Sequence, residues 1–140
     1  MIRSPLCSRV LVLGIVLVAG CNQRPFSTVG VTGSVLYEDG EPIPAEGYKL
    51  RFVPQVESPD GKTFPRVATA LVDGAGNFDG ATSYKYFDGI TAGDNIVYFD
   101  LGSRERGKKL MPEEYLSPKT SPLTIDTAES RTIDIRLPRP

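Results

Sequence analysis

The sequence has no histidine and only two cysteines, Cys7 and Cys21, among its 140 residues. Without histidine, Ser-His-Asp and Cys-His catalytic arrangements are excluded, and a zinc site would have to be built from carboxylates alone. Paired carboxylates remain a catalytic option, but Glu113 and Glu114 are adjacent, and nothing in the sequence sets two carboxyl groups across a cleft. We therefore expect that the protein is not an enzyme and uses no cofactor.

The first 20 residues have the profile of an export signal. Arg3, Arg9 and the amino terminus supply positive charge, and residues 10–19 contain no charged or strongly polar side chain. This apolar run is about half of the ~20 residues that a helix needs to span a bilayer. Because the two arginines are not adjacent, general secretory export is favoured over twin-arginine export. We predict a cleaved signal peptide over residues 1–20.

Val18-Ala19-Gly20-Cys21 ends this segment with small residues and a cysteine. The pattern resembles the lipobox of bacterial lipoproteins, in which the cysteine receives a diacylglyceryl group and the peptide is cut just before it. The resemblance implies that Cys21 is lipidated and that lipid holds the exported protein on the extracytoplasmic side of a membrane, inner or outer. The alternative is a plain secretory peptide with Cys21 as an accidental thiol. If Cys21 is lipidated, the mature chain has neither a free thiol nor a disulfide.

Charge gives little support to a nucleic-acid partner. Without residues 1–20 the chain has 14 basic and 17 acidic side chains, and binding to phosphate backbones needs a clustered basic face. The nearest basic cluster is the segment 104–109, Arg-Glu-Arg-Gly-Lys-Lys, which we interpret as a solvated loop. The alternative is attraction of this segment to anionic lipid headgroups or to an acidic polymer near the membrane.

Residues 21–27 comprise the lipidated cysteine and a short tether. Fully extended, the tether reaches only ~20 Å, so the domain that follows is expected close to the bilayer. In that domain, residues 28–140, short segments alternate in polarity between glycine and proline turns, as where Tyr48, Leu50 and Phe52 alternate with lysine and arginine. Seven strands are predicted: six at 29–37, 48–52, 66–72, 96–101, 123–125 and 132–137, and a short one that begins at residue 78. This pattern predicts an all-β fold, a single seven-stranded Greek-key-type β-sandwich.

Turn and strand motifs over residues 29–101 carry a second resemblance. They are Gly33-Ser34-Val35, Asp39-Gly40-Glu41-Pro42-Ile43-Pro44, Leu50-Arg51-Phe52-Val53-Pro54, Gly76-Asn77-Phe78 and Asp88-Gly89-Ile90-Thr91-Ala92-Gly93. In this order they resemble carboxypeptidase regulatory-like domains, which are prealbumin-like (transthyretin-like) β-sandwiches. The resemblance implies an accessory or structural module, since the hydroxyisourate hydrolases of this fold rely on histidines. The chain departs from the family pattern at Asp94-Asn95-Ile96, where a tyrosine commonly starts the strand.

Asp73, Asn77 and Asp79 are weak candidates for a calcium site. Their spacings of four and two, with glycines nearby, can supply oxygen ligands for a hard cation, but they do not match an EF-hand loop. We interpret them instead as hairpin-turn residues chosen for backbone conformation.

Tyr84, Tyr86 and Phe87 are candidates for contact with a ligand or partner. Exposed aromatic side chains stack on sugar rings or anchor a protein partner. The favoured interpretation is that Tyr84 and Tyr86 share one strand face and close the edge of the sandwich.

Two function classes remain open. The leading prediction is a non-catalytic, lipid-anchored cell-envelope protein that acts as a structural or protein-interaction module, with the membrane and other envelope proteins as partners. The alternative is a module that binds carbohydrate, such as envelope polysaccharide, or calcium.

Overall fold

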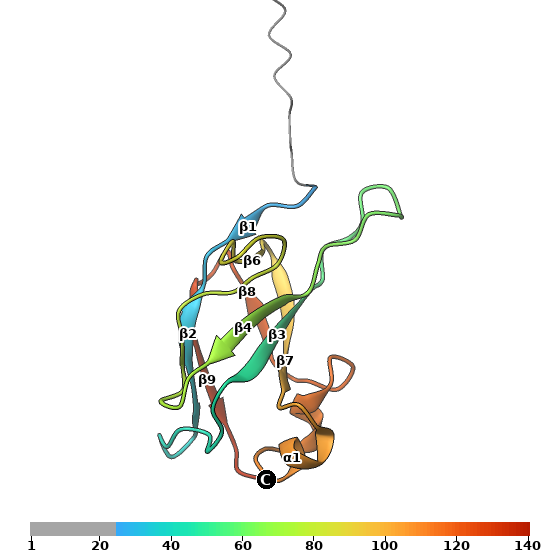
Figure 1. The fold of residues 1–140 in the computed structure, drawn as a ribbon. Helices are drawn as coiled ribbons and strands as arrows, with labels where there is room; N and C mark the ends of the chain where they lie inside the picture. Colours follow the sequence, from blue (N-terminus) through green and yellow to red (C-terminus); the bar gives the residue numbers. More distant parts are fainter. Residues whose placement is uncertain (1–24) are drawn as a thin grey trace, which may run out of the picture.

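The computed structural model describes residues 25–140, so the predicted signal peptide and Cys21 lie outside the described residues. In this part the chain is almost entirely strands and loops, which confirms the predicted all-β class (Figure 1). The strands are β1 (Thr28–Val29), β2 (Thr32–Tyr37), β3 (Tyr48–Pro54), β4 (Ala68–Val72), β5 (Asn77–Phe78), β6 (Ile90–Thr91), β7 (Asp94–Asp100), β8 (Thr124–Asp126) and β9 (Thr132–Leu137). A short helix α1 (Arg104–Lys108) and a 3-10 turn η1 (Glu113–Leu116) complete it. None of the helices in the described range is long and apolar enough to cross a membrane.

The strands form two main sheets, in the orders β5-β2-β9 and β4-β3-β7-β8, and a small sheet of β1 and β6. The strand count within residues 25–140 is nine instead of the predicted seven. The difference arises because the predicted first strand divides at Gly30 and Val31, and because Ile90–Thr91 pairs with β1. In addition, β2 pairs with β9 in parallel, from Thr32 opposite Thr132 to Tyr37 opposite Leu137.

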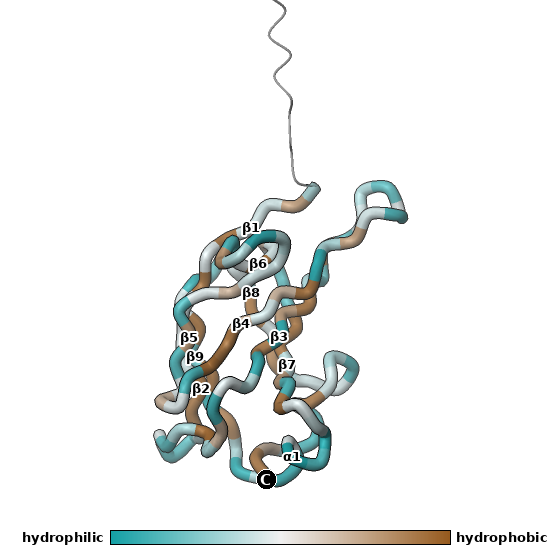
Figure 2. Tube along the Cα trace, in the orientation of Figure 1, coloured by the Kyte–Doolittle hydropathy of each residue, from teal (hydrophilic) through white to brown (hydrophobic). Residues whose placement is uncertain are grey.

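Alternating side chains of the two sheets fill one hydrophobic core. Tyr48, Leu50 and Phe52 of β3 are buried, as their alternation predicts, and so are Ile133, Ile135 and Leu137 of β9. The rings of Phe52 and Phe78 come from different sheets and lie 6.3 Å apart between centroids. Burial of each large apolar side chain contributes roughly 1.5–3 kcal/mol. Figure 2 shows this division, with hydrophobic residues along the strands and hydrophilic ones in the projecting loops.

The folded domain begins earlier than the predicted tether allows. Phe26 is only 7% exposed, and the Ser27 carbonyl accepts a hydrogen bond of 2.9 Å from the Ala92 N–H. Both residues therefore belong to the domain. Pro25, the first described residue, is exposed.

Strand β7 starts two residues before the predicted position because a polar side chain occupies a core position. Asn95 is fully buried, and its Nδ2 donates to the carbonyl oxygens of Thr91 and Gly93 at 2.9 and 3.2 Å. The Gly93 N–H in turn donates to Thr127 Oγ1 at 2.8 Å. These bonds close the corner between β6 and β7.

Candidate functional site

The three calcium candidates and two of the three aromatic candidates border one surface pocket of about 190 Å³; Tyr84 does not. We call it the aromatic pocket; it is lined by Thr69, Leu71, Asp73, Asn77, Phe78, Asp79, Gly80, Thr82, Tyr86 and Phe87. The lining comes from β4, from β5 and from the segment that follows β5. The pocket therefore lies where the edge strand of one main sheet faces the edge strand of the other.

The pocket exists because the edge of β4 is covered at both ends and open between them. At one end Thr69 and Thr82 exchange two backbone hydrogen bonds of 2.9 Å, and at the other the Asp73 N–H donates to the Asn77 carbonyl at 2.9 Å. Backbone groups of alternate strand residues point to the same side. The N–H and C=O of Leu71 therefore face the opening. The Leu71 side chain is itself 63% exposed.

The carboxylate of Asp88 holds the loop that carries the aromatic residues. Its Oδ1 accepts the N–H of Ser83 at 2.8 Å and the Ser83 hydroxyl at 3.1 Å. Its Oδ2 accepts the N–H groups of Tyr84 and Lys85 at 3.1 and 3.0 Å. Successive backbone donors are thus gathered on one side chain, which fixes the turn that precedes Tyr86.

Phe87 has a backbone conformation that a bulky side chain rarely adopts, with φ of 55°. Its N–H donates to Thr82 Oγ1 at 3.1 Å, and its ring packs on Gly80, where an added Cβ would lie 2.8 Å from the ring. The ring of Tyr86 lies 4.3 Å from that of Phe87 between centroids. Such an outlier persists only where its surroundings hold it, and outliers of this kind cluster at functional sites.

The exposure of the aromatic residues differs from the favoured interpretation. Tyr86 is 82% and Phe87 is 56% exposed, so neither closes the core. Tyr84 is half-buried and has the Arg66 guanidinium 4.9 Å from its ring centroid. The prediction that Tyr84 and Tyr86 share one strand face is wrong, because residues 83–87 form bends and turns instead of a strand. Only Tyr86 and Phe87 reach the pocket.

Asp73, one of the calcium candidates, has a local structural role. Asp73 Oδ1 accepts the N–H groups of Ala75 and Asn77 at 3.0 and 2.8 Å, which is the bonding of a turn between β4 and β5. Over residues 25–140, no group of three or more histidine, cysteine, aspartate or glutamate residues is placed to hold a metal ion. The geometry therefore favours the hairpin-turn interpretation of Asp73. Asn77 and Asp79 still offer polar groups to the aromatic pocket.

A pH dependence follows from Asp88. Burial raises the pKa of its carboxyl group, but the hydrogen bonds from Ser83, Lys85 and Tyr84 outweigh burial and leave the pKa below its ordinary value. Since the pKa is lower in the folded than in the unfolded protein, Asp88 stabilises the fold above about pH 4, and this contribution is lost as the pH falls through the folded pKa. We expect Asp88→Asn to flatten the loss of stability between neutral pH and about pH 3 in urea unfolding. Glu129→Gln, on an exposed turn, is the control, and an unchanged slope in Asp88→Asn would contradict the role given to this carboxylate.

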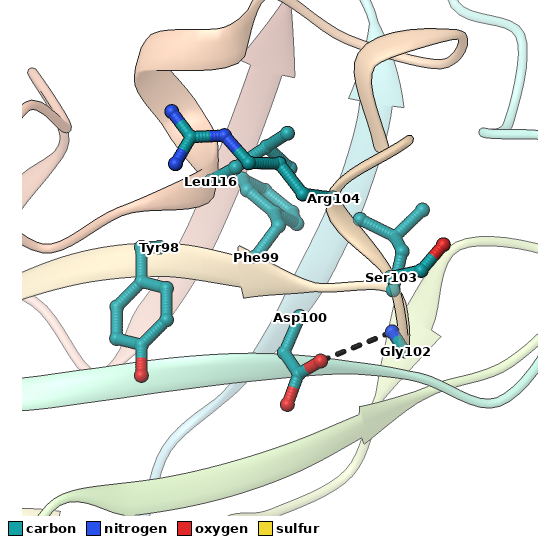
Figure 3. A pocket seen from close by; sticks show the side chains of 8 residues that line it. Tyr98, Phe99, Asp100, Gly102, Ser103, Arg104 and Leu116 are labelled. Atoms are coloured by element: carbon teal, nitrogen blue, oxygen red, sulfur yellow. Dashed lines mark hydrogen bonds between the residues drawn. The ribbon is translucent and has the colours of Figure 1, made fainter. Parts of the chain in front are cut away.

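A second pocket, of about 210 Å³, lies between the end of β7 and η1 (Figure 3). Its charged groups are engaged within the protein. Asp100 accepts hydrogen bonds from the Gly102 N–H at 3.0 Å and from Arg51 at 3.1 Å. Arg104 is paired with Glu113. Because these pairs fasten the segment after β7, we assign this pocket a structural role.

The basic segment 104–109 is a short helix and its cap instead of a loop. Ser103 caps α1 by accepting the Arg106 N–H at 3.2 Å, and Lys108 lies within 3.8 Å of Glu105 and 3.7 Å of Glu113. Figure 1 places α1 at the end of the domain opposite to the one where the chain continues toward residue 24. An anchor at Cys21 would therefore attach to the domain at the end opposite α1.

The chain matches no known family model, no curated protein and no solved structure. The site is therefore defined by its own geometry, as an aromatic pocket at the side of an all-β, sandwich-like domain. The sequence patterns predict Tyr86, Phe87, Asn77 and Asp79 as site residues, but they do not predict Leu71. Its signal was present, because an apolar residue stands at the outward position of a strand where the alternation predicts a polar one.

Proposed function

We propose that this protein is a non-catalytic, lipid-anchored module of the cell envelope that binds a sugar ring of an envelope polysaccharide in the aromatic pocket. The observation that carries the proposal is the exposed pair of Tyr86 and Phe87, held in a fixed conformation beside amide and carboxylate groups. The absence of histidine supports a binding role over a catalytic one. The resemblance to carboxypeptidase regulatory-like domains of the Greek-key β-sandwich type also favours an accessory module.

The chemistry of the pocket suits one ring of a sugar polymer. Its volume of about 190 Å³ is below the roughly 300–1,000 Å³ of sites for drug-sized ligands, so it accepts one unit of a longer chain. The apolar face of a sugar ring stacks on the aromatic pair and on Leu71. Its hydroxyl groups reach Asp79, Asn77 and the backbone groups of Leu71, which offer both a donor and acceptors.

Contact with an envelope protein is the competing function. The exposed Tyr86, Phe87 and Leu71 side chains are also suited to anchoring a protein partner. The two functions differ in what binds to the purified protein alone. A saccharide polymer binds without any other protein, whereas a protein contact requires the partner.

The test compares variants for binding to polysaccharide purified from the same envelope. We expect Tyr86→Ala and Phe87→Ala each to weaken binding at least about tenfold, which corresponds to ~1.4 kcal/mol, while thermal unfolding stays cooperative. Phe64→Ala is the matched control, since Phe64 is similarly exposed but does not line the pocket. Unchanged binding in both pocket variants would exclude the site. The protein contact would be favoured instead if the unaltered protein does not bind polysaccharide and the pocket variants lose a protein that co-purifies with it.

A further inference from the structure

The loop between β3 and β4, residues 55–67, exposes a second apolar group away from the aromatic pocket. Phe64 is 66% exposed, and Val56 and Val67 in the same loop are also exposed. Exposed apolar side chains on one projecting loop gain free energy when they leave water for an apolar surrounding, which favours burial against a protein or a membrane. The position of the loop and the hydrogen bonds within it favour one of these two partners.

The tip of this loop is ordered by one carboxylate. Asp60 Oδ1 accepts the N–H groups of Lys62 and Thr63 at 2.8 and 2.6 Å, and its Oδ2 accepts the Thr63 hydroxyl at 2.8 Å. Ser58 adds a fourth hydrogen bond at 3.1 Å. Hydrogen bonds from Thr63 and Lys62 hold the pKa of Asp60 well below its ordinary value. Phe64 is thus presented by a preformed turn.

The loop projects at the end of the domain where the chain leaves toward Cys21. In Figure 1 its tip reaches the level of the first described residues, while α1 and the C-terminus lie at the opposite end. The domain begins at Phe26, and Pro25 is only four residues after Cys21. Four residues span at most about 14 Å when fully extended. A lipid on Cys21 would therefore bring this end of the domain close to the headgroups of the bilayer.

We propose that the loop 55–67 is a membrane-contact element, in which Phe64 enters the interfacial region of the bilayer and orients the anchored domain. The inference rests on the lipid anchor of the proposed function. Lys62 and Arg66 near Phe64 are balanced by Glu57 and Asp60 in the same loop, so contact depends on apolar burial and not on anionic lipid. The element adds a second point of attachment to the one that a lipid on Cys21 would supply. With two points fixed, α1 faces away from the membrane.

The test uses fluorescence, because the chain has no tryptophan and Phe64→Trp creates a single reporter. The mature lipidated protein is reconstituted into phosphatidylcholine vesicles, with and without brominated acyl chains. We expect the tryptophan emission of the Phe64→Trp protein in vesicles to be blue-shifted relative to the same protein unfolded in urea without detergent. We also expect the brominated lipid to quench this emission at least about twofold. Lys109→Trp, exposed at the α1 end, is the control and should show emission typical of water and no quenching.

The outcomes separate this inference from the proposed function. Flotation with the vesicles and the intact mass establish whether Cys21 carries lipid. If the lipidated protein floats but Phe64→Trp is neither shifted nor quenched, the membrane contact is excluded while the anchor and the aromatic pocket stand. If the emission of Phe64→Trp shifts only in vesicles that also contain anionic lipid, contact through apolar burial of residue 64 is contradicted. If Cys21 carries no lipid, the anchor and the membrane contact both fail, and polysaccharide binding by the aromatic pocket is still decided by its own variants.

Discussion

Gly33→Ala is expected to destabilise the folded domain by about 3 kcal/mol or more, a large share of the ~5–15 kcal/mol that holds a typical domain folded. An alanine Cβ at this position would lie 1.9 Å from the Ile133 carbonyl oxygen and 2.8 Å from Cζ of Phe78. Since β2 lies between β5 and β9, it cannot move away from one neighbour without approaching the other. Urea unfolding followed by circular dichroism measures the loss.

Two other glycines separate steric from conformational effects. Gly30 has no atom within 4 Å of an added Cβ and no positive φ, so Gly30→Ala should be neutral or stabilise by about 0.4–1 kcal/mol through the unfolded chain. Gly47 also faces open space but has φ of 69°, so Gly47→Ala should cost about 1 kcal/mol from backbone strain alone. If Gly33→Ala behaves like Gly30→Ala, the close approach of β2 to β9 is contradicted.

The motif glycines show what sequence patterns predict and what they leave out. Gly33, Gly76 and Gly89 belong to the turn and strand motifs of the sequence. In the structure an added Cβ at each would lie 1.9, 2.4 and 2.0 Å from a backbone carbonyl oxygen, of Ile133, Val35 and Val29 respectively. A motif predicts that a glycine occupies the position but not that a carbonyl oxygen lies where its Cβ would be. The reason lies in a neighbouring segment that local sequence does not specify.

Strand positions were predictable where one face of the strand is buried. The alternation in β3 and β9 gives both the strand and its inward side chains, because the period of two sets which residues reach the core. The parallel pairing of β2 with β9 has no such signal, since its residues are about 100 positions apart. The start of β7 was misplaced because Asn95, a polar residue, fills a core position through bonds to backbone carbonyls.

The candidate site was predictable in its residue types but not in its form. Clustered aromatic and turn residues pointed to Tyr86 and Phe87, yet their exposure depends on the turn held by Asp88. Likewise, the opening beside Leu71 exists only because Thr69 is paired with Thr82 across the edge of β4. Pairing of this kind is decided in three dimensions. Residue chemistry therefore offered ligand or partner contact only as an alternative to edge closure, and the pocket itself required the fold.

Cys21→Ala is expected to abolish lipid attachment and move the protein from the membrane fraction to the soluble fraction. Each acyl CH₂ buried in the bilayer contributes ~0.8 kcal/mol, so two or more chains on one cysteine account for stable anchoring, whereas a short loop with one aromatic residue does not. Metabolic labelling with a fatty acid, followed by fractionation, measures both effects. The membrane contact of Phe64 should disappear together with the anchor, because it depends on the short distance between Cys21 and Phe26.

Cys7→Ala is the matched control for Cys21→Ala. Cys7 lies in the segment predicted to be removed, so its replacement should leave labelling and membrane attachment unchanged. This pair of variants tests the lipobox resemblance at single-residue level. Incorporation of fatty acid into the Cys21→Ala protein would assign the lipid to another residue. The orientation argued for the domain would then lose its basis, because the short segment from Cys21 to Pro25 would no longer limit how far the domain stands from the bilayer.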